Sequence, residues 1–94
     1  MNACHQNLKR EDYKMYKRYH KLERIIRIEY NLFERMLCDK SKRFRIIQHI
    51  ANLLYYKIYY MYYNGMIDES EKLFMINCNN AYYINHINYI DKLY

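Results

Sequence analysis

The chain has 94 residues, of which 52% are hydrophobic and 18% aromatic, and its formal net charge is +6. This length is typical of one domain, and the composition excludes an intrinsically disordered chain. Three widely spaced cysteines favour free thiols over a disulfide framework. Because the sequence has no Gly-rich phosphate loop, nucleophile motif or paired metal-ligand motif, we expect no catalysis, no metal site and no intrinsic cofactor.

The positive charge is concentrated in the first half of the chain. Residues 1–46 hold thirteen Lys/Arg and six Asp/Glu, a net charge of +7, whereas residues 47–94 hold three and four, a net charge of −1. This asymmetry favours an acidic partner for the first half, such as an acidic protein, a nucleic acid or an anionic lipid surface. A solvated helix face in a basic protein would give the same pattern.

The first predicted element is a long amphipathic helix over residues 8–37, a segment without proline or glycine. Its apolar residues recur every three or four positions, the period of a helix that buries one stripe. A second stripe, at the same period, is basic, and the spacing predicts that it occupies a face adjoining the apolar one. The apolar stripe is Met15, Tyr19, Leu22, Ile26, Tyr30, Phe33 and Leu37, and the basic stripe is Arg10, Lys14, Lys17, Lys21 and Arg24.

A second helix is predicted over residues 42–63, with Asp39 or Ser41 as its N-cap. The single glycine of the chain, Gly65, follows Asn64 where a left-handed C-cap is expected. The apolar stripe of this helix consists of Ile47, Ile50, Leu54, Ile58 and Met61.

The remaining residues predict two shorter helices, over residues 67–76 and 81–93, separated by a break at residues 77–80 (Asn-Cys-Asn-Asn). Asp68 and Glu69 fall in the first turn of the helix predicted over residues 67–76, where the helix dipole stabilises negative charge. No segment alternates with period two for long enough to indicate a sheet. The sequence therefore predicts one all-α domain over residues 1–94, a small antiparallel bundle of two long helices and one or two short C-terminal helices.

The most hydrophobic segment, residues 46–63, contains several polar residues and many tyrosines. Because a membrane span requires about 20 mostly apolar residues, this segment is predicted to be a core helix. A tyrosine-rich groove on a basic protein is the alternative, since nucleic-acid bases stack on such rings. The basic amphipathic N-terminus is compatible with an uncleaved mitochondrial address, and a cytoplasmic location is the alternative.

Two segments of the first half resemble the LYR-motif family. Residues 15–21 (Met-Tyr-Lys-Arg-Tyr-His-Lys) are similar to its opening signature. Tyr30-Asn31 is followed, fourteen residues after Tyr30, by Phe44-Arg45, a spacing similar to that in the member that stabilises the mitochondrial cysteine desulfurase. The resemblance covers about residues 13–45.

The resemblance implies a small helical adaptor in the mitochondrial matrix, acting in iron–sulfur cluster assembly or in a respiratory complex. Such adaptors bind the acidic acyl carrier protein, and the acyl-phosphopantetheine of the carrier enters the helical bundle. By this resemblance Tyr16, Lys17 and Lys21 contact the carrier, and Phe44 and Arg45 form a second signature. The charge pattern agrees with this expectation, in which Lys14, Lys17, Lys21 and Arg24 would meet a negatively charged helix of the carrier.

A second resemblance lies in the other half of the chain. Residues 62–74 are similar to the turn and second helix of a pentatricopeptide or tetratricopeptide repeat. This similarity implies a helical-repeat-like module that binds RNA or a peptide, although stable solenoids need about three repeats.

Overall fold

The computed structural model describes the backbone of residues 3–34 and 39–93 and the side chains of residues 13–32 and 39–92. Three helices make up the fold: α1 (Ala3–Glu34), α2 (Lys40–Tyr63) and α3 (Glu69–Leu93). No strand occurs in these described ranges, which confirms the predicted all-α bundle. The predicted end of the first helix near residue 37 lies outside the described residues.

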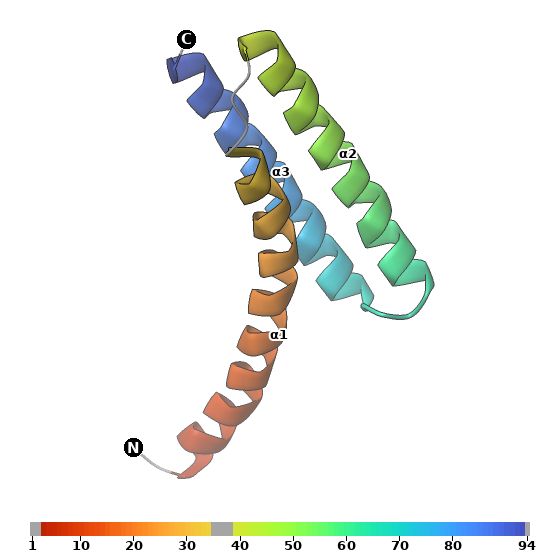
Figure 1. The fold of residues 1–94 in the computed structure, drawn as a ribbon. Coiled ribbons are helices and arrows are strands. Elements are labelled where there is room, and N and C mark those ends of the chain that lie inside the picture. The colour runs from red at the N-terminus through yellow and green to blue at the C-terminus, as the bar shows by residue number, and fades with distance from the viewer. Residues whose placement is uncertain (1–2, 35–38, 94) are drawn as a thin grey trace.

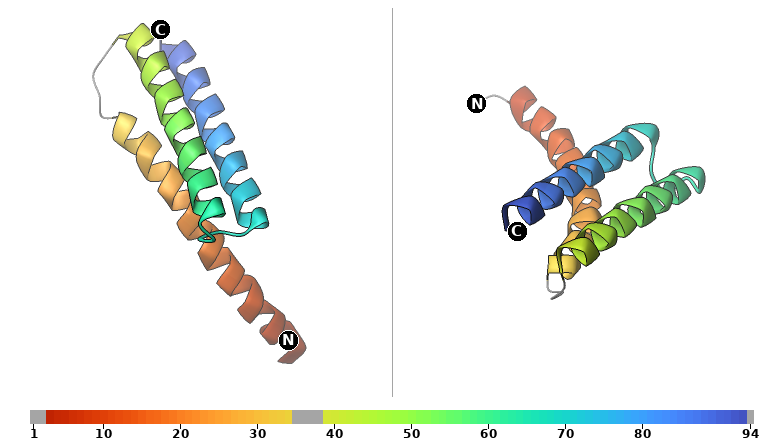
Figure 2. Two further views of the ribbon diagram at one scale, coloured as in Figure 1. Left: turned by 90° about the vertical axis from the view of Figure 1, so that its right-hand side faces the viewer. Right: turned by 90° about the horizontal axis from the view of Figure 1, so that it is seen from above.

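The antiparallel hairpin of α2 and α3 is crossed by α1 (Figure 1). The C-terminal half of α1 packs on the hairpin, and its N-terminal part extends past the turn between α2 and α3 (Figure 2). The molecule is therefore elongated, with extents of 56 × 33 × 17 Å. The projecting part of α1 is a surface that the hairpin does not cover.

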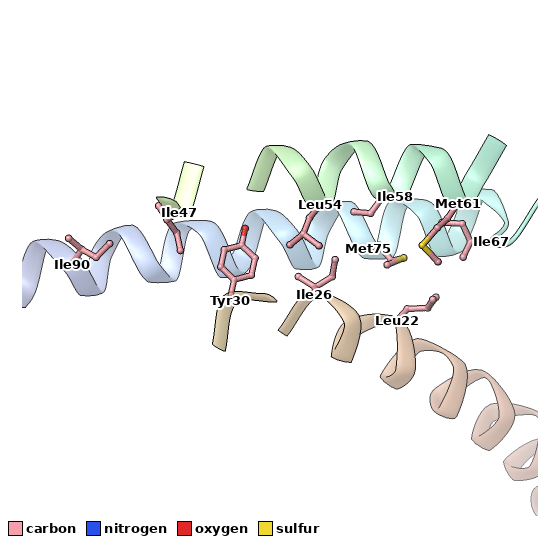
Figure 3. Close-up of a cluster of buried hydrophobic side chains, with 10 residues drawn as sticks. All are labelled: Leu22, Ile26, Tyr30, Ile47, Leu54, Ile58, Met61, Ile67, Met75 and Ile90. Atoms are coloured by element: carbon pink, nitrogen blue, oxygen red, sulfur yellow. The ribbon is translucent and has the colours of Figure 1, made fainter. Parts of the chain in front are cut away.

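All three helices contribute to one core (Figure 3). The predicted stripes are largely confirmed: from α1 the core receives Leu22, Ile26 and Tyr30, each at most 1% exposed. The prediction that Met15 is buried is wrong: its side chain is 56% exposed and lies in a surface pocket with Asp68 and Glu71, near the turn between α2 and α3. The side chains of Phe33 and Leu37 lie outside the described residues. The other buried core residues are Ile47, Leu54, Ile58, Met61, Ile67, Met75 and Ile90, and the predicted Ile50 is half-buried.

Asp39, one of the two residues predicted as N-cap, caps the start of α2. Asp39 has an extended backbone, and its Oδ1 accepts a hydrogen bond of 2.8 Å from the Lys42 backbone N–H. Because this bond satisfies one of the N–H groups that a helix start leaves unpaired, the helix begins at Lys40 rather than at residue 42.

The end of α2 is a Schellman motif around the only glycine. Gly65 N–H donates to Tyr62 O at 3.1 Å, and Met66 N–H donates to Met61 O at 2.9 Å. Gly65 has a φ of +72°, the left-handed region that the sequence predicts for this position.

Gly65→Ala is expected to lower the free energy of unfolding by about 1 kcal/mol, since a Cβ disfavours the left-handed backbone. No atom lies within 4 Å of the point that a Cβ would occupy, so the backbone conformation alone causes the loss. Gly65→Asn is the matched control and should lose less, because asparagine tolerates this region. Urea unfolding followed by circular dichroism measures both, and equal stability of Gly65→Ala and the parent would contradict the expectation.

The predicted break at residues 77–80 is wrong: α3 is one continuous helix. Asparagine lowers helix propensity only modestly, and this segment contains neither proline nor glycine. Asn79 is 3% exposed, and its amide is used inward, donating to Ala51 O at 2.9 Å and accepting from the Tyr30 hydroxyl at 2.6 Å. Tertiary hydrogen bonds thus hold in the helix a residue that usually favours loops.

A capping box starts α3. Asp68 Oδ1 accepts from the Glu71 N–H at 2.8 Å, and Glu71 Oε1 accepts from the Asp68 N–H at 2.9 Å. The helix therefore begins at Glu69, with Asp68 as the cap in front of the first turn rather than within it.

Candidate functional site

The predicted basic stripe lies exposed on α1. We define the basic row as Lys14, Lys17, Lys21 and Arg24, all of which are exposed; the side chain of Arg10 is outside the described part. At about 100° per residue, the row is centred about 160° around the helix from the mean direction of the buried Leu22, Ile26 and Tyr30. The basic row therefore faces away from the core, and the prediction of an adjoining face is wrong.

The charges of the row have no acidic partner among the described side chains. Lys14, Lys21 and Arg24 take part in no ion pair there, and the Lys17 ammonium lies 5.0 Å from the centre of the Tyr13 ring. Arginines elsewhere on the same helix are paired: Arg27 Nε lies 3.8 Å from Glu23 Oε1. The row thus leaves four cations available to an external acidic surface.

Arg18 holds α1 against the hairpin. Its Nε donates to Glu71 Oε2 at 2.7 Å, and its Nη2 donates to Met66 O at 2.8 Å. Both oxygens of the Glu71 carboxylate are thereby used, one by Arg18 and one by the capping box. No sequence motif marks Arg18 as structural, although its position four residues before Leu22 places it at the edge of the buried face.

An aromatic hollow opens on the other flank of α1, where this helix meets the start of α3. We define the aromatic hollow as a cavity of about 310 Å³ lined by Tyr16, Tyr19, His20, Glu23 and Phe74. The Tyr19 and Phe74 rings pack with their centres 4.6 Å apart, and Tyr16 stacks on His20 at 6.0 Å. The predicted contact residue Tyr16 therefore lies at this hollow, and the exposed Tyr13 lies between it and the basic row.

Glu23, the one carboxylate that lines the hollow, accepts a hydrogen bond from a side chain of α3. The Tyr82 hydroxyl donates to Glu23 Oε1 at 2.5 Å. Burial, together with this hydrogen bond, raises the pKa of Tyr82 to about 12. Burial also raises the pKa of the nearby Cys78 thiol, and the charge of Glu23 adds to that effect. Cys78 is thus a thiol rather than a nucleophilic thiolate near neutral pH.

Phe44 and Arg45 are not brought together with the basic row. Both lie in the first turns of α2, whereas Lys14 and Tyr16 lie in the N-terminal half of α1. The start of α2 lies near the C-terminal end of α1 (Figure 1). Phe44 is half-buried against the core, with the Lys40 ammonium 5.8 Å from its ring centre, whereas Arg45 is exposed. The two predicted signatures therefore belong to separate ends of the bundle.

The described part of the chain offers neither a metal centre nor a membrane span. No three side chains of the His, Cys, Asp or Glu types come together there in an arrangement that could hold a metal ion. Within the same residues, no helix has the length and apolar character needed to cross a membrane. No family model, no curated protein and no solved structure matches the chain. Function must therefore be inferred from the surfaces themselves.

Proposed function

We propose that this chain is a small non-catalytic adaptor whose basic row binds an acidic protein. The observation that carries the proposal is the exposure of four cations in one row, without an acidic partner among the described side chains. Such a row favours encounter with, and orientation of, a negatively charged helix. The resemblance to the LYR-motif family supports the acyl carrier protein as that partner, and with it a location in the mitochondrial matrix.

The aromatic hollow gives the proposed contact an apolar component. Tyr16 and Tyr19 line the hollow on a different face of α1 from the basic row, so a partner bound to the row would reach around the helix to place a large apolar group against these rings. The core stripe of α1 is already covered by α2 and α3, with Ile26 and Tyr30 at 0% exposure. An acyl chain attached to a carrier would therefore first meet the aromatic hollow rather than the packed core.

The separate position of Phe44 and Arg45 suits an adaptor that contacts two proteins. In this proposal, the end of the bundle formed by the start of α2 would contact the larger partner, such as the cysteine desulfurase or a respiratory-complex subunit. The basic row would remain open to the carrier at the opposite end.

Reversing Lys17→Glu and Lys21→Glu together is expected to abolish recovery of an acyl carrier protein in affinity purification. Two of four attractive charges become repulsive, and like charges across an interface cost several kcal/mol. Both side chains are exposed, so helicity by circular dichroism should not change.

The matched control reverses two exposed lysines away from the row, Lys57→Glu and Lys92→Glu, which changes the net charge equally. This control should retain the carrier. Undiminished recovery by the row variant, or equal loss in both variants, would contradict the proposal.

A further inference from the structure

The outer surface of α2 carries a cluster of tyrosines that neither the core nor the proposed carrier contact uses. We call this surface the tyrosine face. Its most exposed rings, Tyr56, Tyr60 and Tyr63, are 73%, 65% and 77% exposed. They are four and three residues apart, so they form one line along the helix. The tyrosine face consists of Tyr55, Tyr56, Tyr59, Tyr60 and Tyr63, of which Tyr59 is half-buried.

Most of these rings contact one another. Tyr55 packs against Tyr59 with ring centres 4.8 Å apart, and its hydroxyl lies 3.3 Å from the Tyr59 hydroxyl. Tyr56 meets Tyr55 edge-on at 6.4 Å, and Tyr63 lies 6.0 Å from Tyr59. Because most rings are supported by a neighbour, the cluster offers an aromatic platform in place of isolated, freely rotating side chains.

Lysines from two helices lie near the platform. The 24 residues of α2 include five Lys/Arg and no Asp or Glu; Lys57 lies among the tyrosines, whereas the other four lie at residues 40–45, at the start of the helix. From α3, the Lys72 ammonium lies 5.6 Å from the Tyr59 ring centre and 4.2 Å from that of Tyr62. Lys57, one turn from Tyr60, is exposed, and so is Arg45, which lies farther along the same side of the helix.

The charges and the ring type of this surface favour one binding partner among three: a second copy of the chain, a membrane and single-stranded nucleic acid. A second copy docked through α2 would place two helices without acidic residues against each other, which like-charge repulsion disfavours. A membrane-binding helix is rich in Leu, Phe and Trp on its buried face, whereas this face is built of tyrosine. Single-stranded nucleic acid combines flat bases, which stack on rings, with phosphates, which bind cations.

We propose that the tyrosine face of α2 binds single-stranded nucleic acid. The bases stack on Tyr56, Tyr60 and Tyr63, and the phosphates bind Lys57 and Lys72. Because stacking is available to every base, binding is tolerant of sequence. This activity is independent of the carrier contact, which uses α1.

The test measures the fluorescence anisotropy of labelled oligo(U) and oligo(dT) at low salt, with a duplex of equal length as the comparison. The intact chain should bind both single strands more tightly than the duplex. Replacing Tyr56, Tyr60 or Tyr63 singly by alanine should weaken binding by about 5- to 150-fold per ring. The variants should fold, because each of these rings is mostly exposed.

Two controls test whether the rings of this face are what binds the bases. Phenylalanine at the same three positions should restore binding, since the ring is kept and the hydroxyl is lost. Tyr89→Ala, at a 55% exposed ring on α3, should bind as the parent does. The Lys17→Glu and Lys21→Glu variant should keep its preference for single strands, so failure of the carrier proposal leaves this one testable.

Several results would overturn the inference. These are no binding at low salt, equal affinity for duplex and single strand, or unchanged affinity in the three alanine variants. A dimer in analytical ultracentrifugation that the same alanine variants dissociate would assign the face to a second copy. Capture of an acidic protein by this face, with no oligonucleotide bound, would assign it to protein binding.

Discussion

Tyr30→Ala is expected to lower the free energy of unfolding by about 3–5 kcal/mol, the cost of truncating a buried aromatic residue. Tyr30 is fully buried, and its ring lies 5.5 Å from that of Tyr82 and 5.1 Å from that of His86. Since small domains are stable by only about 5–15 kcal/mol, this loss is a large fraction of the total. Urea unfolding followed by circular dichroism measures it.

Tyr30→Phe isolates the hydroxyl group and keeps the test valid where the alanine variant does not fold. The Tyr30 hydroxyl donates to Asn79 Oδ1 at 2.6 Å, so phenylalanine leaves a buried acceptor without this donor. The expected loss is about 1–3 kcal/mol. Tyr89→Phe removes a hydroxyl from an exposed ring and should change stability by less than about 0.5 kcal/mol. A Tyr30→Phe variant as stable as the parent would show that the buried hydrogen bond is not stabilising.

The contrast between Gly65 and Asn79 shows what the sequence can predict about the fold. Gly65 and the Asp39 cap act through backbone groups a few residues away, so their signals are complete within a short window. Asn79 bonds to Ala51 and Tyr30, which are 28 and 49 positions away. The asparagine-rich segment 77–80 therefore predicts a break in the helix, because no periodicity in the sequence shows which distant residues bond to Asn79.

The candidate surfaces also combine features that the sequence alone predicts with features that depend on how the helices pack. Helical spacing is sufficient to place the basic row on the side of α1 away from the apolar stripe, but which charged side chains of α1 are paired depends on how the hairpin packs. Arg18 is four residues from Lys14, yet it bonds to Glu71, 53 positions away, and is not free to meet a partner. The tyrosines of α2 are visible in the sequence as a composition, whereas their separation into core-facing and outward rings requires all three helices.

Alkaline pH is expected to destabilise the protein more steeply than ionisation of exposed tyrosines alone would. In the unfolded chain tyrosine ionises near pH 10. The pKa of Tyr82 is raised to about 12 in the fold by burial and its bond to Glu23. The pKa of Tyr30 is also raised, first by burial and then by the nearby Tyr83. Both phenols thus stay protonated in the folded chain at a pH where the unfolded chain has lost the protons.

Proton linkage sets the direction in which the free energy of unfolding changes with pH. Above about pH 10 the unfolded state binds fewer protons than the folded state, so stability falls as pH rises, by at most about 1.4 kcal/mol per pH unit for each such phenol. The half-buried Tyr82 should contribute less than this limit, because solvent screens its surroundings. Below about pH 10 the stabilisation from both groups is fully present, and it is lost as the pH rises toward the folded-state pKa values. Urea unfolding between about pH 8 and about pH 12, with tyrosinate absorbance recorded in parallel, measures the slope.

The double variant Tyr30→Phe with Tyr82→Phe is the control for this slope. It retains every lysine and every exposed tyrosine, so its own alkaline slope reports all the other groups. The difference between the two slopes belongs to the buried phenols, because phenylalanine cannot ionise in either state. Equal slopes in the two proteins would mean that Tyr30 and Tyr82 ionise in the fold as they do in the unfolded chain. Such a result is incompatible with a buried Tyr30 hydroxyl that donates to Asn79 and a Tyr82 hydroxyl that donates to Glu23.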